Sequence, residues 1–129
     1  MENKIALLDT SVLIDFYRKK DKSKSFLYKL SQNYQSFAVS AITRYEIYAG
    51  ALSTQIEFWD DFFSNLTVLP FDSEASKVAV AINADLKKNR KQIDIPDLFI
   101  AATAVMYNLP CATLNRKHFE RIEKLELID

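Results

Sequence analysis

Three carboxylates in this 129-residue chain stand where a charged side chain is unfavourable. Asp9 ends the apolar run IALLD, Glu46 lies within the largely apolar segment AITRYEIYAGAL, and Asp97 begins the apolar segment DLFIAATAV. A carboxylate that leaves water without a partner either takes up a proton or binds a cation. Three such acids, each at the edge of an expected core element, predict a shared metal site.

The chemistry expected of such a site follows from its ligands. Three carboxylates close together would raise one another's pKa values unless a divalent cation kept them ionised. Ligands that are all oxygen atoms favour Mg²⁺ or Mn²⁺ over zinc. A cation of this kind can generate hydroxide from water and stabilise negative charge on a phosphate. The residue types therefore indicate metal-dependent phosphate chemistry by Asp9, Glu46 and Asp97.

Each acid also has an ordinary structural interpretation. Asp9 could cap the helix that follows it. Asp97 could be a first-turn acid that the helix dipole favours, and Asp94 could be a cap or could support the site from behind the metal ligands. Glu46 could bond an Arg or Tyr at the edge of an apolar face. The prediction of a metal site depends on the combination of acids.

The helix around Glu46 has an expected apolar face. Ile42, Tyr45, Ala49 and Leu52 fall on one side at helical spacing, and Glu46 falls on that same side. We therefore expect Glu46 to lie among these apolar side chains, where an acid without a partner is rare.

Short apolar segments alternate with helical segments along the chain. The expected strands cover residues 4–9, 36–40, 67–71 and 110–115, with a further strand at 125–129. The expected helices cover residues 11–20, 23–34, 41–52, 54–66, 72–92 and 97–108, and a short turn or helix covers 116–122. This order predicts a three-layer α/β/α sandwich with a central, mostly parallel sheet. Sites of such sheets lie beyond the carboxyl ends of the strands, where we expect Asp9 and Asn115.

The composition is that of one folded domain over residues 1–129. Apolar residues make up 49% of the chain, which supports a core and argues against disorder. The 17 basic and 17 acidic residues give no net charge, whereas a protein that coats nucleic acid is normally basic. Any basic groove would therefore be local. The single Cys111 excludes an internal disulfide, no leader or membrane-spanning run is evident, and we expect a cytoplasmic protein.

Four segments carry a resemblance to a known family: LLDTSVLIDF, SAITRYEIYAGAL, IDIPDLFIAATAV and CATLNRKHFERIEKLEL. With these segments in this order, the chain resembles the PIN-domain ribonucleases, and among them the VapC-type toxins of toxin–antitoxin pairs. The resemblance implies a PIN-like fold and endoribonuclease activity, the Mg²⁺- or Mn²⁺-dependent cleavage of RNA phosphodiester bonds. It also implies a homodimer, and a cognate antitoxin whose tail occupies the active-site groove.

The resemblance extends to single acids. Asp9, Glu46 and Asp97 match the first three acidic positions of the family. The fourth position falls at Asn115, where many relatives carry Asp. An Asn can bind a metal through its carbonyl or order a water, but it adds no charge. One firmly held metal is therefore expected rather than two.

Three hydroxyl side chains match positions beside these acids. Thr10 or Ser11 follows the first acid and Thr113 precedes Asn115, and the resemblance implies that they orient metal-bound water. His118, the only histidine, falls at a variable position of the family and receives no catalytic role.

Basic and aromatic residues are candidates for binding other molecules. Arg44 and Arg116 are the candidates for binding RNA phosphates, because they are close in sequence to Glu46 and Asn115. The basic runs at 18–24 and 87–91 are interpreted as solvated helix ends. The segment FWDDFF is mainly core, with enough aromatic side chains for a partner groove or a dimer seam as well.

Two other functions remain open. One is Mg²⁺-dependent phosphoryl transfer, since receiver and haloacid-dehalogenase-like domains also place Asp after the first strand. The latter normally has a second acid two residues later, where this chain has Ser11, and the acidic pair and late Lys of a receiver are not evident. The other is an inactive metal-binding scaffold, which Asn115 would favour.

Overall fold

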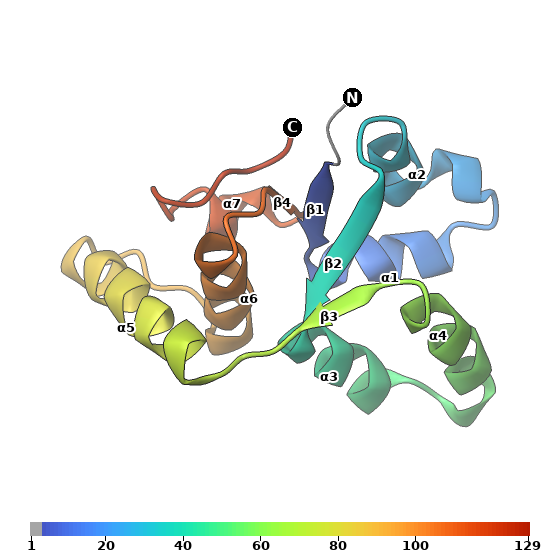
Figure 1. Cartoon of the computed structure of the whole chain (residues 1–129), viewed down its shortest axis with the longest axis horizontal. Coiled ribbons are helices and arrows are strands. Elements are labelled where there is room, and N and C mark those ends of the chain that lie inside the picture. The colour runs from blue at the N-terminus through green and yellow to red at the C-terminus, as the bar shows by residue number, and fades with distance from the viewer. Residues whose placement is uncertain (1–3) are drawn as a thin grey trace.

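A parallel sheet forms the centre of the protein, for which the computed structural model describes residues 4–129. Its strands lie in the order β3-β2-β1-β4, and every pair of neighbours is parallel (Figure 1). The strands are β1 (Ile5–Leu8), β2 (Ser36–Ser40), β3 (Thr67–Leu69) and β4 (Cys111–Ala112). The mostly parallel sheet expected from the sequence is confirmed.

Helices cover both faces of this sheet. Figure 1 shows α5 and α6 on one side of the strands and α1 to α4 on the other. The first group, with α7, comprises α5 (Ser73–Lys88), α6 (Ile95–Met106) and α7 (Arg116–Phe119). The second group comprises α1 (Thr10–Arg18), α2 (Phe26–Ser31), α3 (Ala41–Gly50) and α4 (Ile56–Phe63), with the short 3₁₀ helices η1 (Lys22–Lys24) and η2 (Ser53–Gln55). The three-layer α/β/α architecture is confirmed.

Two cores fill the space between the layers. Successive residues of a strand point to opposite faces, so Leu7 packs with α5 and α6, and Leu8 packs with α1 to α4. Both leucines are fully buried. Ile100 lies in the first core and Trp59 in the second. The central strand β1 therefore contacts both cores and leads directly into Asp9.

Several expected elements are shorter than the sequence pattern indicated. The helix expected at 23–34 is η1 followed by α2, because Ser25 interrupts it and caps α2 by accepting a hydrogen bond from the Tyr28 amide at 3.1 Å. The strand expected at 125–129 contributes a single bridge between Leu127 and Cys111. In the described part of the chain, no helix has the length and apolar character needed to cross a membrane.

Candidate active site

The candidate site lies at the carboxyl edge of the two adjacent strands β1 and β4. Asp9 follows β1 directly, and Thr113 follows β4. The Asp9 amide donates to the Ala112 carbonyl at 2.9 Å, which joins the two strand ends. Asp97 comes from the first turn of α6, the helix that packs beside β4. Residues from three distant parts of the sequence therefore meet at one edge of the sheet.

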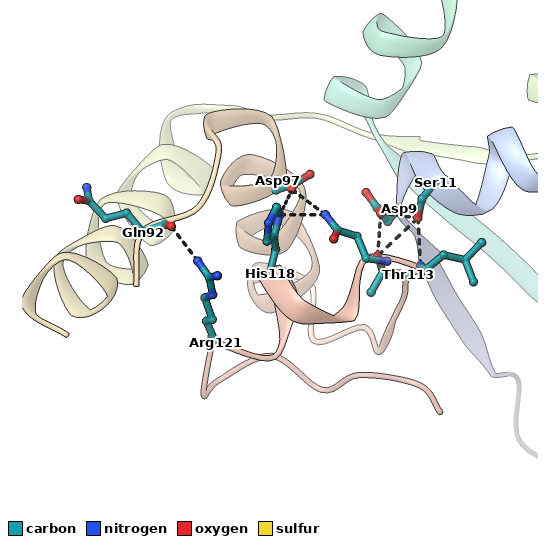
Figure 2. A network of polar contacts seen from close by, with 9 residues as sticks. Asp9, Ser11, Gln92, Asp97, Thr113, His118 and Arg121 are labelled. Atoms are coloured by element: carbon teal, nitrogen blue, oxygen red, sulfur yellow. Dashed lines mark hydrogen bonds and ion pairs between the residues drawn. The ribbon is translucent and has the colours of Figure 1, made fainter. Parts of the chain in front are cut away.

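Asp9 is held by hydroxyl groups. Its side chain is 3% exposed, and its Oδ2 accepts hydrogen bonds from Ser11 Oγ at 2.7 Å and Thr113 Oγ1 at 2.8 Å (Figure 2). Asp9 occupies the N-cap position of α1, yet its side chain makes no capping bond. The interpretation of Asp9 as a helix cap is therefore wrong, because the carboxylate faces the strand ends.

The two hydroxyls are themselves fixed by backbone amides. Ser11 Oγ accepts from the Leu114 amide at 3.0 Å, and Thr113 Oγ1 accepts from the Asn115 amide at 2.9 Å. Because each hydroxyl oxygen accepts a hydrogen bond from a backbone amide, its own proton is directed to Asp9. Ser11 and Thr113 set the position of Asp9 in this structure, and a role in orienting water stays a prediction.

Asp97 has two partners from the segment after β4. Its Oδ2 accepts a long hydrogen bond from Asn115 Nδ2 at 3.3 Å and lies 3.1 Å from His118 Nδ1 (Figure 2). Burial raises the pKa of Asp97 above its ordinary value, the His118 contact opposes this, and the negative charge of Asp9 raises it further. The Asp9 carboxylate therefore lies close enough to Asp97 to affect the ionisation of Asp97.

His118 is a site residue that the sequence prediction missed. Its Nδ1 lies 2.9 Å from Asn115 Nδ2 as well as 3.1 Å from Asp97 Oδ2. Asn115 and His118 are three residues apart across the start of α7, a spacing that places both side chains on one face. That spacing, within the turn or helix expected at 116–122, is the signal that could have identified His118.

Glu46 reaches the site from α3, but not in the expected way. Tyr45 and Leu52 are 71% and 66% exposed, so the predicted apolar face is wrong. The buried residues of α3 are Thr43 and Ile47. Thr43 gives the buried face a hydroxyl, which a search for apolar spacing overlooks.

Thr10 connects Glu46 to the rest of the site. The Thr10 hydroxyl donates to Glu46 Oε1 at 2.6 Å and lies 3.0 Å from the buried Thr43 Oγ1. Because Thr10 adjoins Asp9 in sequence, this bond holds the Glu46 carboxylate beside the start of α1. Thr10 therefore supports Glu46, whereas Ser11 supports Asp9.

The three acids do not form a closed cluster. Among residues 4–129, no group of three or more His, Cys, Asp or Glu side chains has the spacing of a formed metal site. Asp9 and Asp97 influence each other electrostatically, and Glu46 is linked to them through Thr10. The donor set consists of carboxylate and amide oxygens, which fits a hard divalent cation.

The remaining candidate residues lie around this site. Asp94 is exposed at the N-cap position of α6, makes no side-chain capping bond, and adds to the raised pKa of Asp97 through its charge. Arg44 is exposed on α3, with its guanidinium 4.6 Å from the centre of the Tyr48 ring. Arg116 instead donates through Nη1 to the Ile128 carbonyl at 2.8 Å. Arg116 is therefore engaged with the C-terminal segment.

The aromatic side chains of α4 pack mainly into the core, as expected. Trp59 and Phe63 are buried, and Tyr17 of α1 stacks on Trp59 with ring centres 5.4 Å apart. A groove of about 220 Å³ lies between α1, α3 and α4. Its lining includes Ile14, Tyr17, Glu46, Ile47 and Trp59. The groove therefore has an apolar wall and reaches one of the candidate acids.

Comparisons with known proteins point to one family. The pattern that defines the PIN domain matches residues 6–125. The chain is 35% identical to a ribonuclease VapC from Rickettsia bellii, with 95% of this chain and 93% of the relative covered. It is 37% identical to ribonuclease VapC1 from Methanocaldococcus jannaschii, with 98% and 86% covered. A DNA-bound VapBC from Salmonella typhimurium has a similar structure, with TM-score 0.85, 26% identity, and 99% and 98% coverage.

Proposed function

Because the chain belongs to the PIN domain family, we propose that it is a divalent-metal-dependent endoribonuclease and the toxin of a type II toxin–antitoxin pair. It would act in the cytoplasm on RNA phosphodiester bonds. The family match lends no support to the phosphoryl-transfer alternative. An inactive scaffold is the outcome that the cleavage experiment below would reveal.

The observation that carries this proposal is the environment of Asp9. Its carboxylate is buried, and among the described residues it bonds two hydroxyl groups and no basic side chain. Neutral donors orient a carboxylate without cancelling its charge, and the charge of Asp97 is close by. A buried acid in this situation favours a bound cation.

The residues present fit Mg²⁺ or Mn²⁺. Asp9 and Asp97 would hold the ion, Glu46 would approach it from α3, and Asn115 would add a neutral oxygen in place of a fourth acid. When bound, the ion would supply an acidic water and compensate negative charge on the scissile phosphate.

The chain's own contribution is to fix these ligands before RNA arrives. Ser11 and Thr113 hold one oxygen of Asp9, and Asn115 and His118 contact one oxygen of Asp97. In both carboxylates the bonds among described residues use Oδ2, which leaves Oδ1 for other ligands. A preorganised set of oxygens of this kind needs little rearrangement during the reaction.

The groove beside Glu46 supports the antitoxin assignment. An apolar wall that contains Ile14, Ile47 and Trp59 suits the buried face of a bound protein segment, and Glu46 at its edge suits a basic side chain. We therefore assign this groove to the antitoxin tail. The homodimer is part of the same proposal and is supported by the resemblance to VapC-type toxins.

Cleavage of RNA by purified variants tests the proposal. Asp9→Asn and Asp97→Asn should each lower the rate by about a hundred-fold or more while the protein stays folded by circular dichroism. Asp61→Asn, which removes an exposed acid of α4, should cleave like the unmodified chain. Cleavage retained by both site variants would overturn the site, and cleavage that persists in excess EDTA would overturn metal dependence.

A further inference from the structure

A basic hollow lies on the α5 and α7 side of the protein, apart from the acids of the candidate site. It consists of two adjoining depressions at the end of α5, which share Lys91 and Arg121. The first depression has a volume of about 580 Å³. The basic residues that line the hollow are Lys88, Arg90, Lys91, Lys117, Arg121 and Lys124. Three acids, Asp85, Glu120 and Glu123, also line it, so the hollow is positive in a chain with no net charge.

Among residues 4–129, these basic side chains form no ion pairs. The ion pairs in this part of the chain are Lys19–Asp15, Lys77–Glu74 and Arg116–Asp129, and His118 contacts Asp97; none of these includes a side chain of the hollow. The six basic groups of the hollow repel one another in the free protein, because unpaired like charges are unfavourable at short range. A polyanion would remove this repulsion.

Arg90 has a backbone conformation with positive φ, which glycine adopts more readily than arginine. It has φ of 56° and ends α5 in a Schellman turn, in which the Lys91 amide donates to the Leu86 carbonyl at 2.8 Å. Glycine is the usual residue there, since a side chain is strained at positive φ. The same turn ends α6, where Asn108 has φ of 55°, and Asn tolerates this conformation better than Arg. Arg90 therefore brings a charge to the hollow at some loss of stability.

Helix α7 connects the hollow to the candidate site. Arg121 Nη1 donates to the Gln92 carbonyl at 3.0 Å, which ties the loop after α5 to the segment after α7 (Figure 2). Within α7, Lys117 lines the hollow and its neighbour His118 contacts Asp97. A strand with one phosphate at the site can therefore continue across α7 into the hollow.

We propose that the basic hollow binds phosphates of the RNA strand that flank the cleaved bond. This inference rests on the proposed ribonuclease function and adds a location for the RNA strand on either side of the cleaved bond. RNA fits better than an acidic protein segment, because the cations are spread over an open surface and connect to the site that would cleave the strand. Backbone contacts of this kind bind without regard to base sequence.

The test is the salt dependence of RNA binding. In an Asp97→Asn background, the variant with Arg90, Lys91 and Lys117 all changed to Ala is titrated against a short fluorescein-labelled single-stranded RNA of mixed sequence. Each lost phosphate contact should lower the slope of log affinity against log salt by about 0.7, so the three together should lower it by about 2. The loss should be similar for RNAs of different sequence.

A matched variant separates this effect from net charge. Replacing the exposed Lys20, Lys24 and Lys29 by Ala removes the same charge from the α1 and α2 side. An equal fall in slope for both variants would overturn the assignment to the hollow. So would an unchanged slope in the hollow variant, or a hollow variant that binds RNA normally but loses binding to polyglutamate.

Arg90→Gly distinguishes binding from a structural role. It should raise the melting temperature, since Gly suits positive φ, and should also weaken RNA binding. A gain in stability with unchanged binding would count against Arg90 as a phosphate contact. Failure of the proposed ribonuclease function gives a different result. The unmodified chain would then not cleave RNA at all, whatever the salt dependence of binding in the hollow variant.

Discussion

The hydroxyl support of Asp9 makes a prediction about Thr113. Thr113→Val keeps the shape of this 2% exposed side chain but removes its hydroxyl. The change deletes the 2.8 Å bond to Asp9 Oδ2 and the 2.9 Å acceptor of the Asn115 amide. A hydrogen bond to a charged group contributes about 1.5–3 kcal/mol, and an amide left without its partner adds about 1 kcal/mol. The free energy of unfolding should therefore fall by about 3 kcal/mol.

Thr113→Ser is the matched control because it keeps the hydroxyl and loses a buried methyl group. That loss should lower the free energy of unfolding by about 1 kcal/mol. For a domain of this size the two variants should lower the melting temperature by about 12 °C and about 4 °C. The measurement is urea unfolding followed by Trp59 fluorescence in EDTA, with RNA cleavage measured in Mg²⁺. A Val variant as stable as the Ser variant, or equally active, would refute the role of this hydroxyl.

Two further predictions concern Asp97 and Lys22. The raised pKa of Asp97 means that its ionised form destabilises the fold above that pKa, an effect that disappears as pH falls to the ordinary value of 3.8. Asp97→Asn should therefore become more stable relative to the unmodified chain as pH rises from 3.8 through the raised pKa of Asp97. A difference in melting temperature between the two proteins that does not change with pH would contradict this prediction. Lys22 Nζ donates to the carbonyls of Phe16 at 2.6 Å and Tyr17 at 2.9 Å and lies over the Phe16 ring. Lys22→Met should thus lower the free energy of unfolding by about 2 kcal/mol in urea titrations, against less than about 0.5 kcal/mol for the exposed Lys20→Met, and equal effects would contradict a structural role for Lys22.

The sequence predicted the layers of the fold because periodicity reports burial. Four apolar runs bounded by helical segments specify a parallel sheet covered on both faces, and Asp9 falls at a strand end by residue order alone. Element lengths were predicted less well. Ser25 splits the expected helix at 23–34 through a single hydrogen bond to the Tyr28 amide, which leaves no trace in the apolar pattern.

The parts of the site that were missed depend on contacts between distant residues. Thr43 is fully buried on α3 and contacts Thr10 of α1, so the inner face of this helix is partly polar. Tyr45 looks apolar in sequence but faces solvent. The contact of His118 with Asp97 joins residues 21 positions apart, so the spacing of Asn115 and His118 alone does not show that this face meets Asp97. Arg116 binds the Ile128 carbonyl, a partner that only the folded chain brings near.

The alternation of Leu7 and Leu8 between the two cores has a consequence for cooperative unfolding. The layer that holds α5 and α6 and the layer that holds α1 to α4 have separate cores on opposite faces of the sheet, although Ile42 of α3 packs against the first core. Each layer is therefore expected to open as a unit. Asp97 belongs to the first layer and Glu46 to the second, with Asp9 on the strand between them. Amide hydrogen exchange should show β1 as the last strand to exchange, with two separate groups of helical amides before it. Opening of either layer then separates the acids while most of the hydrogen-bonded backbone is still intact.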